Sequence, residues 1–446
     1  MTSGVATLDI QAAVATILTE IAACGSIAND LERRLQSLTG DYSPSAWAKR
    51  RTTGMDRAKT SRSSLGNLRF THLAMNNWRN FRHVDVDLQK RVFLVGPNAS
   101  GKSNFLDVFR FLRDIASVGG GFRQAVGRRH GVSSIRTLSA RKYPDVTVCV
   151  SLGDEHELKS WTYTLSFRQD KLRRPVIAAE KVLYEGKELL ARPNEEDKKD
   201  PERLTQTYLE QVNVNQTFRK LADFLASVRY LHIVPQLVRE PDRSVGRKND
   251  PFGGDFLEQI ARVPERTQKS RLTRICSALG SAVPQLKKIE LARDMNGTPH
   301  LRGKYEHWRP HGAWQSEEQF SDGTLRLLGL LWAVLEGGGP LLLEEPELSL
   351  HPEVVRTLPQ VLARVNRRTG RQIVLSTHSS ELLDDAGIGL DETLLLFPTS
   401  EGTEVSTAGS HADVKALLEG GLRLSEAVMP KTRPQHVEQL SIFGDA

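Results

Sequence analysis

The sequence predicts an α/β fold, and three patterns along the chain support this prediction. A short apolar strand at 91–95 runs into a glycine-rich loop, and apolar residues at helical spacing follow at 104–115. Apolar and polar residues alternate from about 143 to 190, which is typical of antiparallel strands. A second apolar strand, Leu341–Leu343, ends directly in two glutamates.

Length and composition indicate a globular protein, and its positive net charge is compatible with a polyanionic partner. The chain has 446 residues, which is enough for two or three domains. A net charge of +7 and a pI of about 9.3 fit a polyanion partner such as nucleic acid. Three scattered cysteines favour a reducing cytoplasm over a disulfide framework or a zinc site. No apolar run reaches the roughly 18 residues of a membrane span, and early basic residues of a secretory signal are missing.

The first 66 residues predict a helical extension followed by a basic linker. Apolar residues recur at helix-like intervals between positions 8 and 21. The stretch 46–64 then carries six lysines and arginines against one aspartate, without apolar periodicity. It is either an arm on nucleic-acid phosphates or a solvated tether, and we favour the tether.

The long middle of the chain predicts a compact lobe, because 104–319 contains no sustained heptads of a coiled-coil arm. Its expected elements are a helical stretch at 204–227, a strand at 229–235, a loop at 240–255, helices at 256–260 and 268–279, and a strand at 286–293.

The segment Gly96–Ser103, GPNASGKS, matches the phosphate-binding pattern G-x-x-x-x-G-K-[ST]. Backbone N–H groups of such a loop surround the phosphates of a nucleotide, and the following helix N-terminus adds partial positive charge. Lys102 is expected to reach the β and γ phosphates, and Ser103 to bind Mg²⁺. The predicted nucleotide-binding residues here are Gly96, Pro97, Asn98, Ala99, Ser100, Gly101, Lys102, Ser103 and Asn104.

Two adjacent glutamates follow the strand Leu341–Leu343. An unpaired charge at the end of a buried strand is costly, so the pair indicates a function. Glu344 is expected to hold Mg²⁺, and Glu345 to act as the general base for an attacking water. The plainer alternative is a strand that simply emerges into solvent.

Two shorter motifs complete the pattern. FSDGT at Phe320–Thr324 precedes an apolar helix, so Ser321 and Gly323 are expected at a helix N-terminus, which can bind an anion. His378 ends an apolar strand in STHS and is expected to sense phosphate or to orient water. Alone, each motif has a structural alternative: an ordinary turn for the first and a hydrogen-bonded structural histidine for the second.

Together, in this order, the four motifs resemble the ABC-type ATPase heads of the SMC, RecF and OLD families, over about residues 68–400. The resemblance implies an ABC-type P-loop NTPase head with an inserted antiparallel β lobe and a helical subdomain. It also implies that two heads enclose two ATP molecules. Each ATP would lie on Gly96–Ser103 of one subunit and meet Ser321 and Gly323 of the other, with Glu347–Pro352 as the D-loop.

Two departures from the family pattern concern the magnesium site and a glutamine. Glu344 stands where many ABC proteins have aspartate, which loosens the expected magnesium shell. The Q-loop glutamine is not evident; Gln124 and Gln236 are both candidates.

The expected domains are five. They are a helical extension and basic linker (1–66), an ATPase lobe with the glycine loop (67–142), an inserted β and helical lobe (143–310), an ATPase lobe with the remaining motifs (311–400) and a tail (401–446).

The resemblance implies an ATPase that forms a homodimer or higher homo-oligomer and gates a separately encoded effector, such as a nuclease, in DNA or phage sensing. OLD-type relatives carry a nuclease domain after the head, and the sequence after residue 379 looks too short for one. A RecF-like DNA-repair ATPase and a slowly hydrolysing, nucleotide-locked scaffold are alternatives. An ABC transporter head fits less well, because the insert is long and no membrane partner is indicated.

Overall fold

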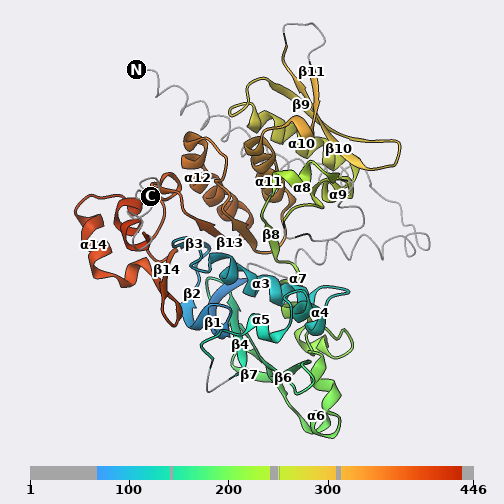
Figure 1. Ribbon diagram of the computed structural model, residues 1–446, viewed down its shortest axis with the longest axis vertical. Helices are drawn as coiled ribbons and strands as arrows, with labels where there is room; N and C mark the ends of the chain where they lie inside the picture. Colours follow the sequence, from blue (N-terminus) through green and yellow to red (C-terminus); the bar gives the residue numbers. More distant parts are fainter. Residues whose placement is uncertain (1–67, 141–143, 242–249, 251, 308–312, 434–446) are drawn as a thin grey trace, which may run out of the picture. The chain divides into compact units, whose positions relative to one another are not determined.

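The computed structural model describes residues 68–140, 144–241, 250, 252–307 and 313–433 (Figure 1). The helical extension and basic linker expected at 1–66 lie outside the described residues. The chain divides into two compact units. The larger unit comprises Asn67–His232, Gly337–Leu348 and Leu358–Ala446, and the described part of the smaller comprises Ile233–Glu336 and Ser349–Thr357.

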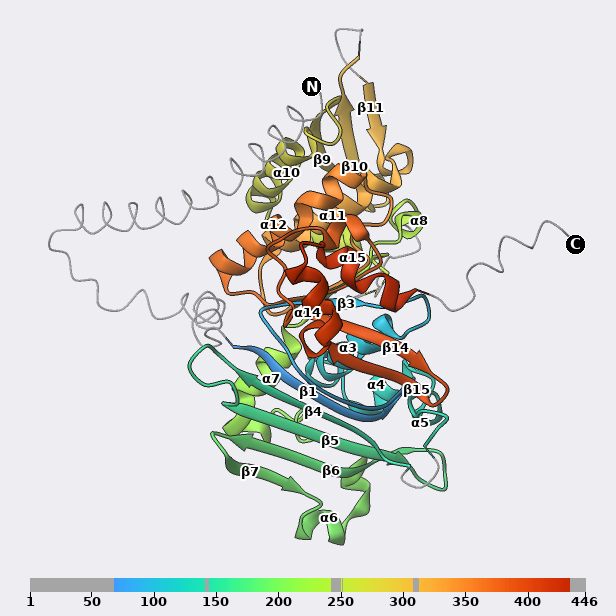
Figure 2. The same ribbon diagram turned by 90° about the vertical axis from the view of Figure 1, so that its left-hand side faces the viewer.

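An antiparallel six-stranded sheet forms one layer of the larger unit, with the strand order β2-β1-β4-β5-β6-β7 (Figure 2). The strands are β1 (Arg69–Trp78), β2 (Phe81–Asp87), β4 (Val146–Gly153), β5 (Trp161–Gln169), β6 (Pro175–Tyr184) and β7 (Lys187–Arg192). Side chains along β5 alternate between buried and half-buried. The antiparallel strands expected from the period-two pattern are therefore confirmed.

A second six-stranded sheet of the larger unit has the order β15-β14-β3-β13-β12-β8. Its strands are β3 (Arg91–Val95), β8 (Arg229–Leu231), β12 (Leu341–Glu344), β13 (Ile373–Thr377), β14 (Thr393–Thr399) and β15 (Gly402–Thr407). All neighbouring pairs are parallel except β14 and β15. The carboxyl ends of parallel neighbours meet at one sheet edge, where ligands bind in open α/β sheets.

Helix α3 (Lys102–Ala116) carries much of the aromatic core of the larger unit. The ring of Phe109 lies 4.7 Å from that of Phe70 on β1, and the ring of Phe111 lies 5.5 Å from that of Phe167 on β5. All four rings are buried. This packing fixes the helix that follows the glycine loop.

The remaining helices of the larger unit are short. They are α4 (Phe122–Gly127), α5 (Val132–Ile135), α6 (Glu195–Lys199), α7 (Arg219–Ala226), α13 (Ser380–Leu383), α14 (Ala412–Glu419) and α15 (Leu424–Val428), with 3₁₀ turns η2 (Pro201–Thr205), η3 (Asn215–Phe218), η6 (Ala408–Ser410) and η7 (Pro430–Thr432). Helix α12 (Pro352–Thr369) has residues in both units.

The helix expected over 204–227 is wrong in its first half, since only α7 is α-helical there. The physical reason is the buried carboxylate of Glu180. It accepts hydrogen bonds from the backbone N–H groups of Tyr208 (2.9 Å) and Leu209 (3.2 Å). These N–H groups therefore bind a side chain instead of the carbonyl groups of a helical turn.

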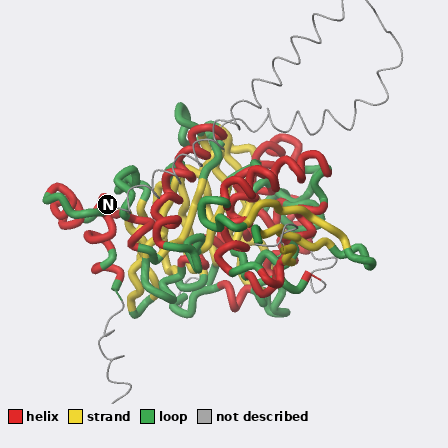
Figure 3. Tube along the Cα trace, turned by 90° about the horizontal axis from the view of Figure 1, so that it is seen from above, coloured by secondary structure: helices red, strands yellow, loops and turns green. Residues whose placement is uncertain are grey.

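The smaller unit combines an antiparallel three-stranded sheet, β11-β10-β9, with helices (Figure 1). Figure 3 shows the helices, strands and loops of the described residues by colour. Its elements are α8 (Pro235–Val238), α9 (Phe256–Ala261), α10 (Glu265–Leu279), β9 (Leu286–Arg293), β10 (Pro299–Tyr305), β11 (Ala313–Ser316), η5 (Glu317–Gln319) and α11 (Asp322–Glu336). The helices and the strand expected at 256–293 are confirmed, as is the apolar helix after FSDGT.

The two mixed units confirm the α/β fold class. The domain boundaries expected from the sequence stay predictions. Within the described residues, no helix is both long and apolar enough to cross a membrane.

Candidate functional site

The glycine loop connects the central strand β3 to helix α3, as predicted. Ala99 and Gly101 adopt positive φ angles of 63° and 96°. A Cβ atom at Gly101 would overlap the side chain of Asn80, and one at Gly96 would lie 2.6 Å from Ser100 Oγ. Glycine at both positions therefore permits the tight turn of the loop.

Asn80, in the turn between β1 and β2, holds the loop in shape. Its Nδ2 donates to the carbonyl of Ser100 (2.9 Å) and to Thr403 Oγ1 (2.8 Å), and its Oδ1 accepts from Asn104 Nδ2 (2.8 Å). The sequence motifs do not reveal this contact, because Asn80 lies outside the local loop pattern.

The N-terminus of α3 offers an anion site. Its first turn contains no acidic residue, and Gly101 precedes it without a side-chain cap. The first N–H groups of a helix lack helical partners and carry partial positive charge. Asn98, Ala99 and Ser103 are exposed, so a phosphate can approach this loop.

Lys102 lies buried across the loop with its ammonium group already in place. Its Nζ donates to the carbonyls of Gly96 (3.0 Å) and Pro97 (3.1 Å) and lies 3.3 Å from His378 Nδ1. Burial lowers the pKa of Lys102, and three nearby glutamates oppose that shift. The loop thus holds a cation where phosphates would bind.

Glu344 ends β12 between two hydroxyl groups. Its Oε1 accepts a hydrogen bond from Ser103 Oγ, and its Oε2 accepts one from Tyr230 OH on the neighbouring strand β8. Burial and the charge of Glu344 raise the pKa of Tyr230, so its hydroxyl remains a donor. The guanidinium of Arg110 lies 4.2 Å from the centroid of the Tyr230 ring. Tyr230 belongs to none of the sequence motifs, which therefore do not reveal its role.

Tyr230→Phe is expected to raise the Mg²⁺ concentration needed for half-maximal ATP turnover by about 10-fold or more, because groups that orient a metal ligand affect affinity on that scale. Phenylalanine keeps the ring under Arg110, so thermal stability should change little. Magnesium titrations of turnover measure the effect, with Tyr184→Phe at an exposed tyrosine as the matched control. Identical magnesium dependence in both variants would show that Tyr230 does not position Glu344.

Glu345 directly follows the strand and is paired with His378. Its backbone has a left-handed φ of 43°, and its N–H donates to the carbonyl of Ser376 (3.1 Å). Its Oε1 lies 2.6 Å from His378 Nε2. This hydrogen bond is the main reason why the pKa of Glu345 is lowered. The carboxylate therefore stays ionised at neutral pH, as a general base must.

Glu347 anchors the end of β13. Its buried Oε1 accepts from Thr377 Oγ1 (2.6 Å) and from the backbone N–H of His378 (3.1 Å). Burial raises the pKa of Glu347. The family resemblance assigned Glu347 to a D-loop, whereas its described contacts hold the strand end that carries His378.

Five predicted site residues come together in the larger unit, at the carboxyl ends of β3, β12 and β13 and the start of α3. They are Lys102, Ser103, Glu344, Glu345 and His378. These residues fit a magnesium nucleotide. The loop has no room for a side chain at Gly96 or Gly101, and Lys102 lies across it. The hydroxyl of Ser103 and the carboxylate of Glu344 are in contact, and both are oxygen ligands of the kind that Mg²⁺ prefers.

Ser321 and Gly323 belong to the smaller unit, whereas the glycine loop belongs to the larger. Ser321 is exposed, and its Oγ accepts from the N–H of Thr324 (3.2 Å), which caps α11 as predicted. A Cβ at Gly323 would overlap the carbonyl oxygen of Ser349. Gly323 of the FSDGT motif therefore packs directly against the backbone of Ser349, the residue after Leu348.

Arg239 fixes the same motif within the smaller unit. Its Nη2 donates to the carbonyl of Phe320 (2.7 Å) and to Asp322 Oδ1 (2.6 Å). The sequence offered no cue for this arginine. The two Q-loop candidates, Gln124 on α4 and Gln236 on α8, are both exposed, and the choice between them stays open.

A cavity of about 750 Å³ borders the glycine loop in the larger unit. Gly96, Pro97 and His378 line one part of it. Residues of α15 and η7, and Met429 between them, line another. This part of the tail carries no motif, so the sequence did not indicate a role for it.

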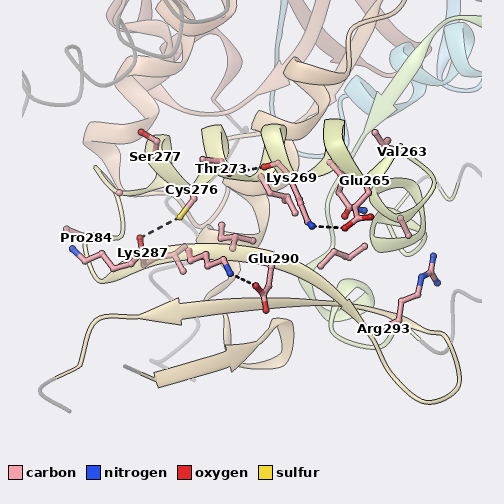
Figure 4. A pocket seen from close by; sticks show the side chains of 18 residues that line it. Val263, Glu265, Lys269, Thr273, Cys276, Ser277, Pro284, Lys287, Glu290 and Arg293 are labelled. Atoms are coloured by element: carbon pink, nitrogen blue, oxygen red, sulfur yellow. Dashed lines mark hydrogen bonds and ion pairs between the residues drawn. The ribbon is translucent and has the colours of Figure 1, made fainter. Parts of the chain in front are cut away.

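A second cavity, of about 1000 Å³, lies between α10 and β9 in the smaller unit (Figure 4). Two of its cations are paired, Lys269 with Glu265 (2.6 Å) and Lys288 with Glu290 (2.7 Å). None of the predicted site residues lines it, so it is separate from the proposed nucleotide site.

Residues 91–384 match the family model described as "AAA domain, putative AbiEii toxin, Type IV TA system". Among curated proteins, the chain is 32% identical over 80 residues to "Endonuclease GajA" of Bacillus cereus (strain VD045), covering 17% of this chain and 14% of that protein. It is 27% identical over 146 residues to "Methionine import ATP-binding protein MetN" of Rhizobium meliloti (strain 1021), covering 30% and 40%. The chain thus spans less than half the length of either relative.

Solved structures with similarity include SMC heads. The SMC head domain from Thermotoga maritima has a TM-score of 0.40 and 13% identity, covering 76% of this chain and 98% of that one. The Smc head domain with an extended coiled coil, bound to the C-terminal domain of ScpA, from Pyrococcus furiosus has a TM-score of 0.45 and 11% identity, covering 80% and 100%.

Proposed function

Because the chain belongs to the AAA-domain family whose model it matches over residues 91–384, a group of ABC-type, SMC- and OLD-like ATPases, we propose that it binds ATP with Mg²⁺ and hydrolyses it. One observation carries the proposal. Lys102, Ser103, Glu344, Glu345 and His378, from three separate segments, meet at the carboxyl ends of adjacent parallel strands.

Different residues of the site would bind the phosphates, hold Mg²⁺ and accept a proton. The N–H groups of the loop and of the first turn of α3 hold the phosphates, and Lys102 adds a positive charge beside them. Ser103 and Glu344 would hold Mg²⁺, which offsets phosphate charge when bound. Glu345 accepts the proton of the attacking water, and His378 orients the Glu345 carboxylate through Nε2.

We extend the proposal to a homodimer with shared sites. Ser321 and Gly323 lie at the N-terminus of α11, where Ser321 is exposed and Gly323 half-buried, and a helix N-terminus can bind a phosphate. The family resemblance assigns that phosphate to the ATP of a second copy. Arg239 and the Ser349 backbone hold the motif in shape, which supports a binding role over a simple turn.

The proposed ATPase controls a separately encoded effector, most simply a nuclease. It does so in DNA or phage sensing in the cytoplasm. The match to a family described as a toxin of a toxin–antitoxin system, and the short match to an endonuclease, support this choice. RecF-like DNA repair and a slowly hydrolysing scaffold are the alternatives. Copurification with a neighbouring nuclease or toxin gene product favours defence, whereas a replication protein as partner favours repair.

The test of the ATPase itself is phosphate release by the purified full chain with ATP, with and without Mg²⁺ and with and without DNA. We expect release that requires Mg²⁺. A chain that neither hydrolyses ATP nor assembles in its presence would overturn the proposal.

A further inference from the structure

We infer that the outer face of the β9–β11 sheet in the smaller unit binds single-stranded nucleic acid. Side chains alternate between the two faces of a strand. The strand register places Lys304 directly opposite both Lys288 and Trp314, with Arg302 two residues away on the same face. One aromatic ring and three cations therefore share this face.

The sheet has a buried face and an outer face. Ile289 and Leu301, which point the other way, are 5% and 0% exposed. Trp314 is 39% exposed, although tryptophan is normally well covered. An exposed tryptophan on an anchored sheet is a rigid platform on which an unpaired base can stack.

Two cationic side chains lie close to the Trp314 ring. The Arg302 guanidinium carbon lies 5.1 Å from the centroid of the Trp314 ring, and Lys288 Nζ lies 5.6 Å from it. Glu290 is the one acidic side chain among the described strand residues of this face, and it pairs with Lys288 at 2.7 Å. The face is thus net positive, which suits a phosphate backbone.

The combination favours a single strand over a duplex. Bases in a duplex are stacked and paired, so their faces are closed to Trp314, whereas a single strand offers both base faces and phosphates. Three strands about 4.8 Å apart give a platform roughly 10 Å wide, on which one unpaired strand can lie. The surface does not depend on ATP hydrolysis, so its failure would leave the proposed ATPase intact.

The test is fluorescence anisotropy of a labelled single-stranded DNA oligonucleotide with the full chain, without ATP, over a series of salt concentrations. We expect Trp314→Ala to weaken binding about 10-fold, since stacking on one aromatic ring has this scale, and Trp314→Phe to retain most of it. The Arg302→Ala and Lys304→Ala variants should weaken binding several-fold and reduce its salt dependence. Lys171→Ala, at an exposed turn of the larger unit, is the matched control.

Wild-type binding by Trp314→Ala, or tighter binding of a duplex of the same sequence than of the single strand, would overturn the inference. If Trp314→Ala unfolds, the other variants still decide. Binding equal to that of Lys171→Ala in both Arg302→Ala and Lys304→Ala would also contradict it.

Discussion

Glu345→Gln is expected to lower ATP turnover by about 10²- to 10⁴-fold, the usual contribution of a general base. Glutamine has nearly the shape of glutamate, so it should keep its place beside His378 Nε2, 2.6 Å away in the native chain. An amide cannot accept the proton of the attacking water. ATP should therefore bind and persist, and the ATP-bound dimer should accumulate.

Two measurements check this expectation: steady-state phosphate release, and molecular mass by light scattering with and without ATP. Glu353→Gln makes the same change at an exposed glutamate that pairs with Arg356, and it should leave both readouts unchanged. Unchanged turnover in Glu345→Gln would remove Glu345 from the role of base.

Lys102→Ala is expected to reduce turnover about 10²- to 10³-fold, the scale for removing one group that stabilises charge in a transition state. It should also weaken ATP binding, unlike Glu345→Gln. The native ammonium group lies within 3.0–3.1 Å of two loop carbonyls, so its loss removes the cation from the phosphate loop.

Nucleotide titration by calorimetry and phosphate release measure the two effects of Lys102→Ala. Lys415→Ala, at an exposed position of α14, is the matched control for loss of a lysine. A thermal melt separates loss of binding from loss of fold. ATP affinity and turnover equal to those of the control would place the nucleotide elsewhere.

Local patterns predicted much of the fold and of the candidate site. The glycine loop, the strand before Glu344 and the apolar helix after FSDGT each depend on neighbouring residues, so their period and punctuation reveal them. The glutamates were predicted because charged residues at the end of a buried strand require a reason. His378 was predicted because STHS follows the other motifs in order.

Contacts between distant segments could not be predicted in this way. Tyr230 meets Glu344 only because β8 pairs in parallel with β12, and Asn80 supports the glycine loop from another sheet. The helix expected over 204–227 failed because Glu180, distant in sequence, binds that backbone. Each depends on tertiary pairing, which no local window contains.

The central claim is that ATP is hydrolysed at a site shared by two copies of the chain, and mixing two inactive variants tests it most directly. Lys102→Ala inactivates the glycine loop of its own chain. Ser321→Arg inactivates the FSDGT motif that would contact the ATP of the partner chain. At equal amounts, about half of the dimers are mixed and each holds one intact site of two, so about a quarter of wild-type turnover is expected. No recovery at any mixing ratio would contradict the claim and indicate a self-contained site.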